Sequence, residues 1–187
     1  MERKVIKCHI ANNEKRKLYP SAELVLKLCY EDYKRIIETY DKIYNKTNIA
    51  LAFTGVLLLV IIGELDYTVL IKRVFSCTNP LEFFSLLLYS LCSLGSALLI
   101  IISSIKLLFL LKSTPITVFN SISLRTEELY NEEKESTALW TIEKITTATE
   151  ELKGLNDKKN KKLNNAIVLI AISLICYSIA IIIKKGV

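Results

Sequence analysis

The chain has 187 residues, of which 51% are hydrophobic, and its mean hydropathy is +0.35. This size suits one small membrane domain with modest soluble parts and excludes a separate full-size enzyme domain beside it. The formal net charge is +6, with no aromatic-basic stacking motif, and the five cysteines include no CxxC pair. The composition therefore indicates neither a nucleic-acid-binding protein nor a disulfide framework.

The first 20 residues are polar, so we expect a polar N-terminal tail and no cleavable signal peptide. Ser21 is predicted to cap a cytosolic amphipathic helix over residues 21–46. The apolar and aromatic residues of this helix recur in steps of three and four, at Leu26, Tyr30, Tyr33, Ile37, Tyr40 and Tyr44. Two alternatives remain for this seam: it docks on the chain's own cytosolic part, or it joins copies of the chain.

Residues 47–63 form the first uncharged apolar run, at the short limit for a membrane-spanning helix. No proline separates this run from the preceding helix, so one continuous helix over residues 22–63 is expected. Lysines precede the run and acidic residues follow it, which favours a cytoplasmic N-terminus. Residues 64–82 are then an outer loop that carries Cys77, and its last residues, CTNP, are predicted to cap the next helix.

Residues 83–105 are the strongest membrane signal, because these 23 positions carry no charge. A helix of that length is about 34 Å long, enough for a hydrocarbon core of about 30 Å. Together with the first run it predicts a transmembrane hairpin over residues 47–112.

Residues 113–164 are predicted to be a cytosolic helical region, with a helix from about residue 136 that bends near Gly154. Residues 165–187 hold the third transmembrane helix and a short tail, since positions 166–183 are uncharged. Lysines are more frequent on the cytoplasmic flanks of the three spans than on the outer flanks, which places the N-terminus inside and the C-terminus outside. The predicted membrane-flanking basic residues are Lys42, Lys46, Lys106, Lys112, Lys158, Lys159, Lys161 and Lys162.

The predicted fold is therefore all-α: an integral membrane helical protein with three transmembrane helices and long cytosolic helical extensions. The alternative for the third run is a shallow or re-entrant helix, with both termini inside.

Small residues recur at helical spacing in the second and third runs. They are Ser90, Ser93, Ala97 and Ser104, and Ser173, Cys176 and Ala180. Such residues let helices approach closely in lipid, so they mark candidate packing faces, and a face lining a water path is the alternative. We expect a homo-oligomer held by these faces and by the cytosolic seam.

Catalytic chemistry is not indicated. The single histidine, His9, has no further ligands at metal-binding spacing, and the sequence has no phosphate-binding loop and no serine-nucleophile elbow. We therefore expect no enzyme activity, cofactor or metal. The apolar runs contain no Asp, Glu, Arg or His, which argues against an ion pump or a coupled transporter.

Two stretches carry a family resemblance that covers about residues 35–187. The segment YDKIYNKTNIALAFTGVLLL, a helix with a lysine just before a short first span, resembles the start of Pycsar-type transmembrane effector modules. The segment TIEKITTATEELKGLNDKKNKKLNNAIVLIAISLICYSIAIII is similar to the C-terminal part of those modules and of related SLATT-type defence proteins.

The resemblance implies a membrane effector of a bacterial anti-phage defence system. Such an effector assembles in the inner membrane and permeabilises or depolarises it when a nucleotide second messenger, or a partner protein that makes or binds that messenger, activates it. It implies a multi-pass inner-membrane protein with a cytoplasmic N-terminus, and no direct nucleic-acid binding is expected. The alternative function is a non-enzymatic membrane scaffold that recruits a soluble partner through its cytosolic helices.

Overall fold

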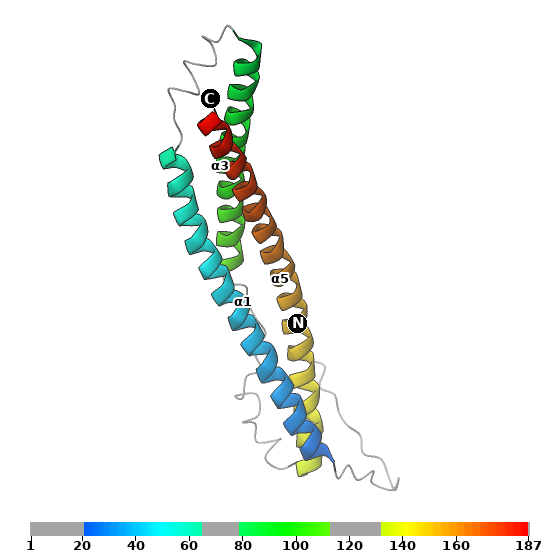
Figure 1. The fold of residues 1–187 in the computed structure, drawn as a ribbon. Helices are drawn as coiled ribbons and strands as arrows, with labels where there is room; N and C mark the ends of the chain where they lie inside the picture. The colour runs from blue at the N-terminus through cyan, green and yellow to red at the C-terminus, as the bar shows by residue number, and fades with distance from the viewer. Residues whose placement is uncertain (1–20, 65–78, 113–131, 187) are drawn as a thin grey trace, which may run out of the picture.

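The described residues of the chain are helical almost throughout. The structure, a computed structural model, describes residues 21–64, 79–112 and 132–186, and it contains three helices there (Figure 1). The predicted tail 1–20, residues 113–131 and the loop position Cys77 lie outside the described residues.

The helix α1 runs unbroken over Ala22–Glu64, as the absence of proline predicted. Its first turn contains Glu23, whose negative charge is favourable at a helix N-terminus. The carbonyl of Ser21 accepts a hydrogen bond of 3.0 Å from the backbone N–H of Val25, the geometry expected of a residue at the N-cap position.

The helix α3 spans Pro80–Leu111, and its start follows the predicted capping signal. The side chain of Asn79 accepts a hydrogen bond of 3.2 Å from the backbone N–H of Leu81, and Pro80 occupies the first turn, where its missing N–H costs nothing. The helix continues past the predicted span and ends six residues beyond Ile105.

The helix α5 spans Lys134–Gly186 and is the longest of the three, with 53 residues. It passes through Gly154 without a break. It also continues without interruption through the third apolar run, so that segment does not form a re-entrant turn.

The helices α1 and α5 run in the same direction, and α3 runs in the opposite direction beside their C-terminal halves (Figure 1). Cross-helix bonds give the register. Asn156 reaches Ile36, and Lys184 reaches Glu64, each 120 residues away along the chain. Between α3 and α5, Ser103 bonds Ala166 and Ser173 bonds Ser96, so a step along one helix matches an equal step backwards along the other.

This register brings the three apolar runs to one level. Residues 47–63 of α1 lie beside residues 167–183 of α5 and residues 86–102 of α3, all within the apolar runs seen in the sequence. We call this level of the bundle the apolar layer. A helix of 17 to 23 residues is about 25 to 35 Å long, which is the thickness range of a bilayer's hydrocarbon core.

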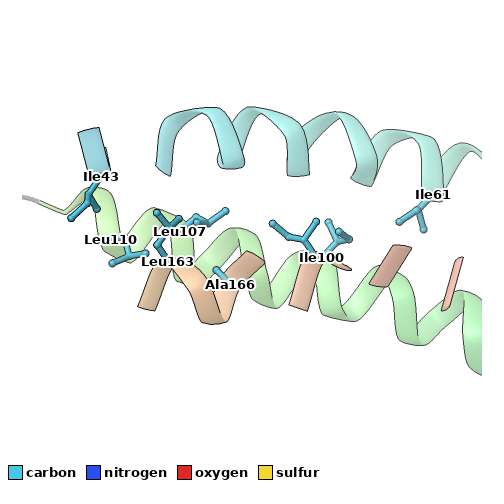
Figure 2. Packing of buried hydrophobic residues seen from close by; sticks show 8 residues of the cluster. Ile43, Ile61, Ile100, Leu107, Leu110, Leu163 and Ala166 are labelled. Carbon is cyan, nitrogen blue, oxygen red and sulfur yellow. The ribbon is translucent and has the colours of Figure 1, made fainter. Parts of the chain in front are cut away.

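A continuous apolar core joins the three helices within and just beside this layer. Figure 2 shows Ile43 of α1 close to Leu110 of α3 and Leu163 of α5 at one end of the core, with Ile100 near the middle and Ile61 towards the other end. The eight buried members are Ile43, Ile61, Ile100, Leu107, Leu110, Leu163, Ala166 and Ile170.

Beyond the apolar layer, α1 and α5 continue as a two-helix arm, which we define as residues 22–40 of α1 and 134–157 of α5. Its core consists of Tyr33, Ile145, Ala148 and Leu152, with Leu26, Ile37 and Tyr40 packed against it. The aromatic seam of α1 therefore docks on α5 of the same chain, which was the first of the two alternatives.

Two members of the predicted seam lie elsewhere. The side chains of Tyr30 and Tyr44 are 56% and 44% exposed, so the expectation that they join the seam is wrong. Cys29 and Ile36 pack against the arm core, together with the seam members that do join it. The residues that face α5 therefore include Cys29 and Ile36, each one residue before a member of the predicted seam.

At the tip of the arm, Lys134 of α5 forms an ion pair with Glu23 of α1. The hydrogen bond to Glu23 and the charge of its carboxylate raise the pKa of the Lys134 ammonium above its ordinary value. Both side chains are well exposed, so the pair contributes little to stability.

Asn156 is a polar side chain buried inside the arm's seam, at the end of the arm nearer the apolar layer. Its Nδ2 donates a hydrogen bond of 3.0 Å to the backbone carbonyl of Ile36, and the residue is only 4% exposed. Its Oδ1 is buried and has no hydrogen-bond partner among the described residues. A buried polar atom without a partner costs about 1–3 kcal/mol, so this position weakens the seam while fixing its register.

The effect of replacing Asn156 on the stability of the arm should therefore depend on whether the new side chain is apolar or charged. We expect Asn156→Leu to be neutral or stabilising, because it removes the unpartnered oxygen and adds apolar packing. We expect Asn156→Asp to destabilise the arm by about 2–4 kcal/mol, because a carboxylate would then face the Ile36 carbonyl in a buried site. Hydrogen exchange at the backbone amides of residues 33–43, followed by mass spectrometry, measures both effects; faster exchange in Asn156→Leu than in Asn156→Asp contradicts this account.

Candidate functional site

The centre of the apolar layer contains hydroxyl groups, although its outer surface is apolar. Six Ser and Thr side chains from all three helices are at most 4% exposed: Thr47, Thr54, Ser93, Ser96, Ser103 and Ser173. The outer surface has the opposite character. In the most apolar windows of α1, α3 and α5, only 17%, 28% and 22% of residues are buried, so most apolar side chains face outwards.

Two of these hydroxyls bond across the interface between α3 and α5. The Oγ of Ser103 donates to the carbonyl of Ala166 at 3.0 Å, and the Oγ of Ser173 donates to the carbonyl of Ser96 at 2.8 Å. Both residues are fully buried. Small side chains let the two backbones approach closely enough for a hydroxyl of one helix to reach a carbonyl of the other.

Three of the other four hydroxyls bond within their own helices. Thr47 donates to the carbonyl of Ile43, Thr54 donates to that of Leu51, and Ser96 donates to that of Ser93, each at 2.8 Å. Each of these groups therefore has a hydrogen-bond partner despite full or nearly full burial, as polar groups inside a protein require.

The register sorts five of the six hydroxyls into two layers, and Ser93 lies about one turn beyond them, on the side away from the arm. Thr54, Ser96 and Ser173 lie at one level, and Thr47 and Ser103 lie about two helical turns towards the arm, beside Ala166. Between them the core is apolar, at Ile100 and Ile170. The interior of the bundle thus alternates polar and apolar levels and is packed with side chains of its own chain.

The predicted small residues divide between buried and partly buried positions. Ser93, Ser173 and Ala180 are buried, whereas Ser90, Ala97, Ser104 and Cys176 are partly buried. Ala97 packs against the core of the bundle. Sequence reasoning missed Ser96 and Ser103, although the spacing of Ser93, Ser96, Ile100 and Ser103 in steps of three and four would have found them.

A pocket opens at the end of the apolar layer opposite the arm. Tyr89, Ser93, Tyr177 and Ala180 are among its lining residues, and so is the ion pair of Glu64 with Lys184. The ammonium of Lys184 lies 3.3 Å from both the carboxylate and the backbone carbonyl of Glu64. The buried hydroxyl of Ser93 thus lies at the wall of a recess, and the charged groups of Glu64 and Lys184 lie at its edge.

The predicted membrane-flanking lysines come together at the other end of the apolar layer. By the register, Lys106 of α3 lies level with residues 43 and 163 of the other helices, and Lys112 lies level with residues 37 and 157. The remaining six lie on α1 and α5 between those levels or within three residues of them. We call these eight side chains the lysine belt: Lys42, Lys46, Lys106, Lys112, Lys158, Lys159, Lys161 and Lys162.

Seven of the eight belt side chains are exposed, and Lys159 is partly buried. The ammonium of Lys159 donates to the hydroxyl of Tyr40 at 3.0 Å and lies 4.5 Å from the centroid of that ring. Tyr40 thus holds one belt charge against α1. Three carboxylates, from Glu38, Asp41 and Asp157, lie at the same levels as the eight belt lysines. The described residues at this end of the apolar layer therefore carry a clear excess of positive charge.

Among the described residues, no group of three or more His, Cys, Asp or Glu side chains could hold a metal ion. The described cysteines, Cys29, Cys92 and Cys176, are free thiols and partly buried. The functional groups that the described part of the chain brings together are therefore the buried hydroxyls, the lysine belt and the ion pair of Glu64 with Lys184.

No protein-family model matches this sequence, and comparisons with curated proteins and with solved structures find no significant match. The structure defines the class of the chain: a helical protein whose three helices, α1, α3 and α5, are each long and apolar enough to cross a membrane.

The contact between α3 and α5 should depend on the size of residue 173 more than on its hydroxyl. We expect Ser173→Ala to lower the stability of the bundle by about 0.5–1 kcal/mol through the lost bond to Ser96. Ser173→Leu should cost more, about 1–3 kcal/mol, because the site is fully buried and has no room for a larger side chain. Thermal unfolding of protein in lipid nanodiscs measures both.

Ser178 provides the matched control, because it lies on the same helix but is exposed and bonds only its own Leu174 carbonyl. The substitution Ser178→Leu should leave the midpoint nearly unchanged. Equal losses for Ser178→Leu and Ser173→Leu would show that the α3–α5 contact does not carry the effect.

Proposed function

We propose that the chain is an integral membrane protein whose three helices cross the bilayer at the apolar layer. The observation that carries this proposal is the inverted polarity of the bundle: aliphatic and aromatic side chains cover its outer surface at this level, while hydroxyls lie inside. In water such a surface would be strongly unfavourable, whereas lipid tails solvate it. The equal level of the three apolar runs supports the same reading.

The lysine belt supports a cytoplasmic position for the arm. Lysines accumulate on the cytoplasmic side of membrane spans, and the described residues at the opposite end of the bundle include fewer cations, with Glu64 and Glu82 beside Lys184 and Lys185. Because α1 and α5 run in parallel, the two chain ends then lie on opposite sides of the membrane, with the start of α1 inside and the end of α5 outside.

Cysteine labelling tests this orientation. In a background without the five native cysteines, Lys34→Cys places a thiol on the exposed surface of the arm, and Glu82→Cys places one at the other end of the bundle. An impermeant maleimide added to intact bacterial cells should label Glu82→Cys alone, and it should label both variants after the membrane is opened. Labelling of Lys34→Cys but not of Glu82→Cys in intact cells contradicts the proposed orientation.

We further propose that this membrane protein is an effector of bacterial anti-phage defence, which assembles with copies of itself and permeabilises the inner membrane when triggered. Its sequence resemblance to Pycsar-type and SLATT-type effectors supports this function. The hydroxyl layers support it physically, because helices that separate in a larger assembly would present hydroxyls, in place of aliphatic side chains, to a water path. The arm, which extends away from the apolar layer, offers a surface for the signal or its protein carrier.

In this proposal permeabilisation requires α3 to move away from α5, since their contact buries the hydroxyls of Ser103 and Ser173. A disulfide between these helices should therefore block it. In the cysteine-free background, the pair Ser96→Cys and Ser173→Cys places two thiols where a side chain already reaches the opposite backbone at 2.8 Å. We expect phage infection of cells with the protein and its neighbouring genes to depolarise the membrane, and the oxidised pair to prevent this.

A potential-sensitive dye reports the depolarisation, and alkylation followed by mass spectrometry reports disulfide formation. Each single cysteine variant is the control and should respond as the parent does; reduction of the double variant should restore the response. Depolarisation by a fully cross-linked protein would contradict opening between α3 and α5. The absence of depolarisation in the parent protein during infection would contradict the effector function itself.

A membrane scaffold is the second candidate, and one observation favours it. Near the tip of the arm, the side chains of Leu24, Val25 and Leu28 are 61%, 40% and 55% exposed, although this end lies far from the apolar layer. A soluble partner could cover these side chains. Stoichiometric co-purification of one soluble partner, lost in Leu24→Asp, together with an unchanged membrane potential during infection, would favour the scaffold.

A further inference from the structure

We propose that the lysine belt is a binding site for the phosphate groups of anionic phospholipids, and that it makes the bundle selective for them. The inference rests on insertion of the apolar layer in a bilayer, and it does not require the protein to permeabilise that bilayer.

The belt lies where a bilayer has its phosphates. Its levels correspond to residues 37–46 of α1, which directly precede the apolar layer. These positions extend over about 14 Å along the helix axis, comparable to the headgroup region next to a hydrocarbon core. A lysine stem can lie along the apolar surface while its ammonium reaches the headgroups, so even Lys106 and Lys46, which are closest to the layer, can contact phosphate.

Among the described residues, the charge of the belt is largely uncompensated. Eight lysines face three carboxylates at these levels, and no ion pair joins a belt lysine to another of the described residues. Of the eight, Lys159 is held by the ring and hydroxyl of Tyr40. Clustered lysines on the cytoplasmic side of a membrane span attract anionic lipids, because the surface potential there is negative.

Exposed asparagines share the level of the belt and add neutral hydrogen-bond donors. Their side-chain amides carry N–H groups that can donate to phosphate or ester oxygens while the lysines supply the charge. They lie on α1 and α5: Asn45, Asn160, Asn164 and Asn165.

The distribution of the belt favours lipid phosphates over one soluble phosphate compound. Its members come from all three helices and lie on the convex outside of the bundle, whereas a compact phosphate ligand is normally held in a concave site with convergent donors. The recess described above, beside Glu64 and Lys184, lies at the opposite end of the apolar layer from the belt. Separate cations on three helices at the proposed membrane boundary match separate lipid headgroups.

Lipid retention tests this assignment directly. The purified full chain is placed in nanodiscs that contain equal amounts of phosphatidylcholine and phosphatidylglycerol, and the lipids that remain bound after extraction are counted by native mass spectrometry. We expect phosphatidylglycerol to be enriched over its share in the mixture. The enrichment should fall towards the bulk ratio in a belt variant with one change on each helix: Lys46→Gln, Lys106→Gln and Lys162→Gln.

A matched control removes the same charge from the arm, outside the belt. Its changes are Lys27→Gln, Lys34→Gln and Lys153→Gln, at exposed positions. This variant should keep the enrichment of the parent protein, whereas each belt lysine is expected to contribute about fivefold in lipid preference. Equal retention of both lipids by the parent, or equal loss in the belt and arm variants, overturns the proposal.

A second arm of the experiment separates lipid phosphate from free phosphate. In phosphatidylcholine nanodiscs, millimolar inorganic pyrophosphate should leave the thermal midpoint of the parent protein unchanged, while nanodiscs containing phosphatidylglycerol should raise it. An equal rise with pyrophosphate, lost in the belt variant, would assign the belt to soluble phosphate compounds and overturn the lipid assignment. Circular dichroism checks that the belt variant keeps its helix content. If it does not, the parent's lipid preference between low and high salt decides, since an electrostatic preference must weaken as salt rises.

Discussion

The register between the three helices is the constraint on which the other features depend. Four cross-helix bonds define it, from Asn156 to Ile36, from Lys184 to Glu64, and from the two α5-facing serine contacts of α3. If α5 moved by one turn along α1, it would shift by about 5.4 Å. The apolar runs would then no longer lie at one level, and lysines would move towards the lipid tails. In the lipid surroundings that we propose, hydrophobic burial cannot set this register, so polar contacts and close backbone approach must do so.

The hydroxyl groups buried among apolar side chains are a consequence of the solvent that we propose for the outer surface. In a water-soluble bundle the buried side chains would be large and aliphatic, because their transfer from water drives folding. When the surroundings are as apolar as the core, that driving force is absent. Serine and threonine are then suitable interior residues, because they allow close packing and donate hydrogen bonds to backbone carbonyls. The aliphatic side chains at Ile100 and Ile170 fill the space between the hydroxyl levels, which keeps the interior filled with the chain's own atoms.

Much of the fold follows from local sequence signals, whereas the inward faces of the helices do not. The missing proline before residue 47 predicted the continuous α1, and Asn79 with Pro80 predicted the start of α3. The inward faces were harder, because steps of three and four admit more than one starting position. The aromatic spacing chose Tyr30 and Tyr44, which face solvent, and the serine spacing chose Ser90 and Ser104 over Ser96 and Ser103. Which of these residues face inwards depends on where the neighbouring helix lies, and the sequence of one helix alone does not give that position.

The continuity of α1 and α5 through the boundary of the apolar layer has a mechanical consequence. Neither helix has a proline, a break or a loop where the arm meets the layer, so about 80 Å of α5 and about 65 Å of α1 behave as two stiff rods joined along their length. A torque applied to the tip of the arm is then transmitted along these rods to the hydroxyl levels instead of being absorbed at a hinge. A displacement of the tip of the arm would therefore reach the contact with α3 with no hinge in α1 or α5 to absorb it.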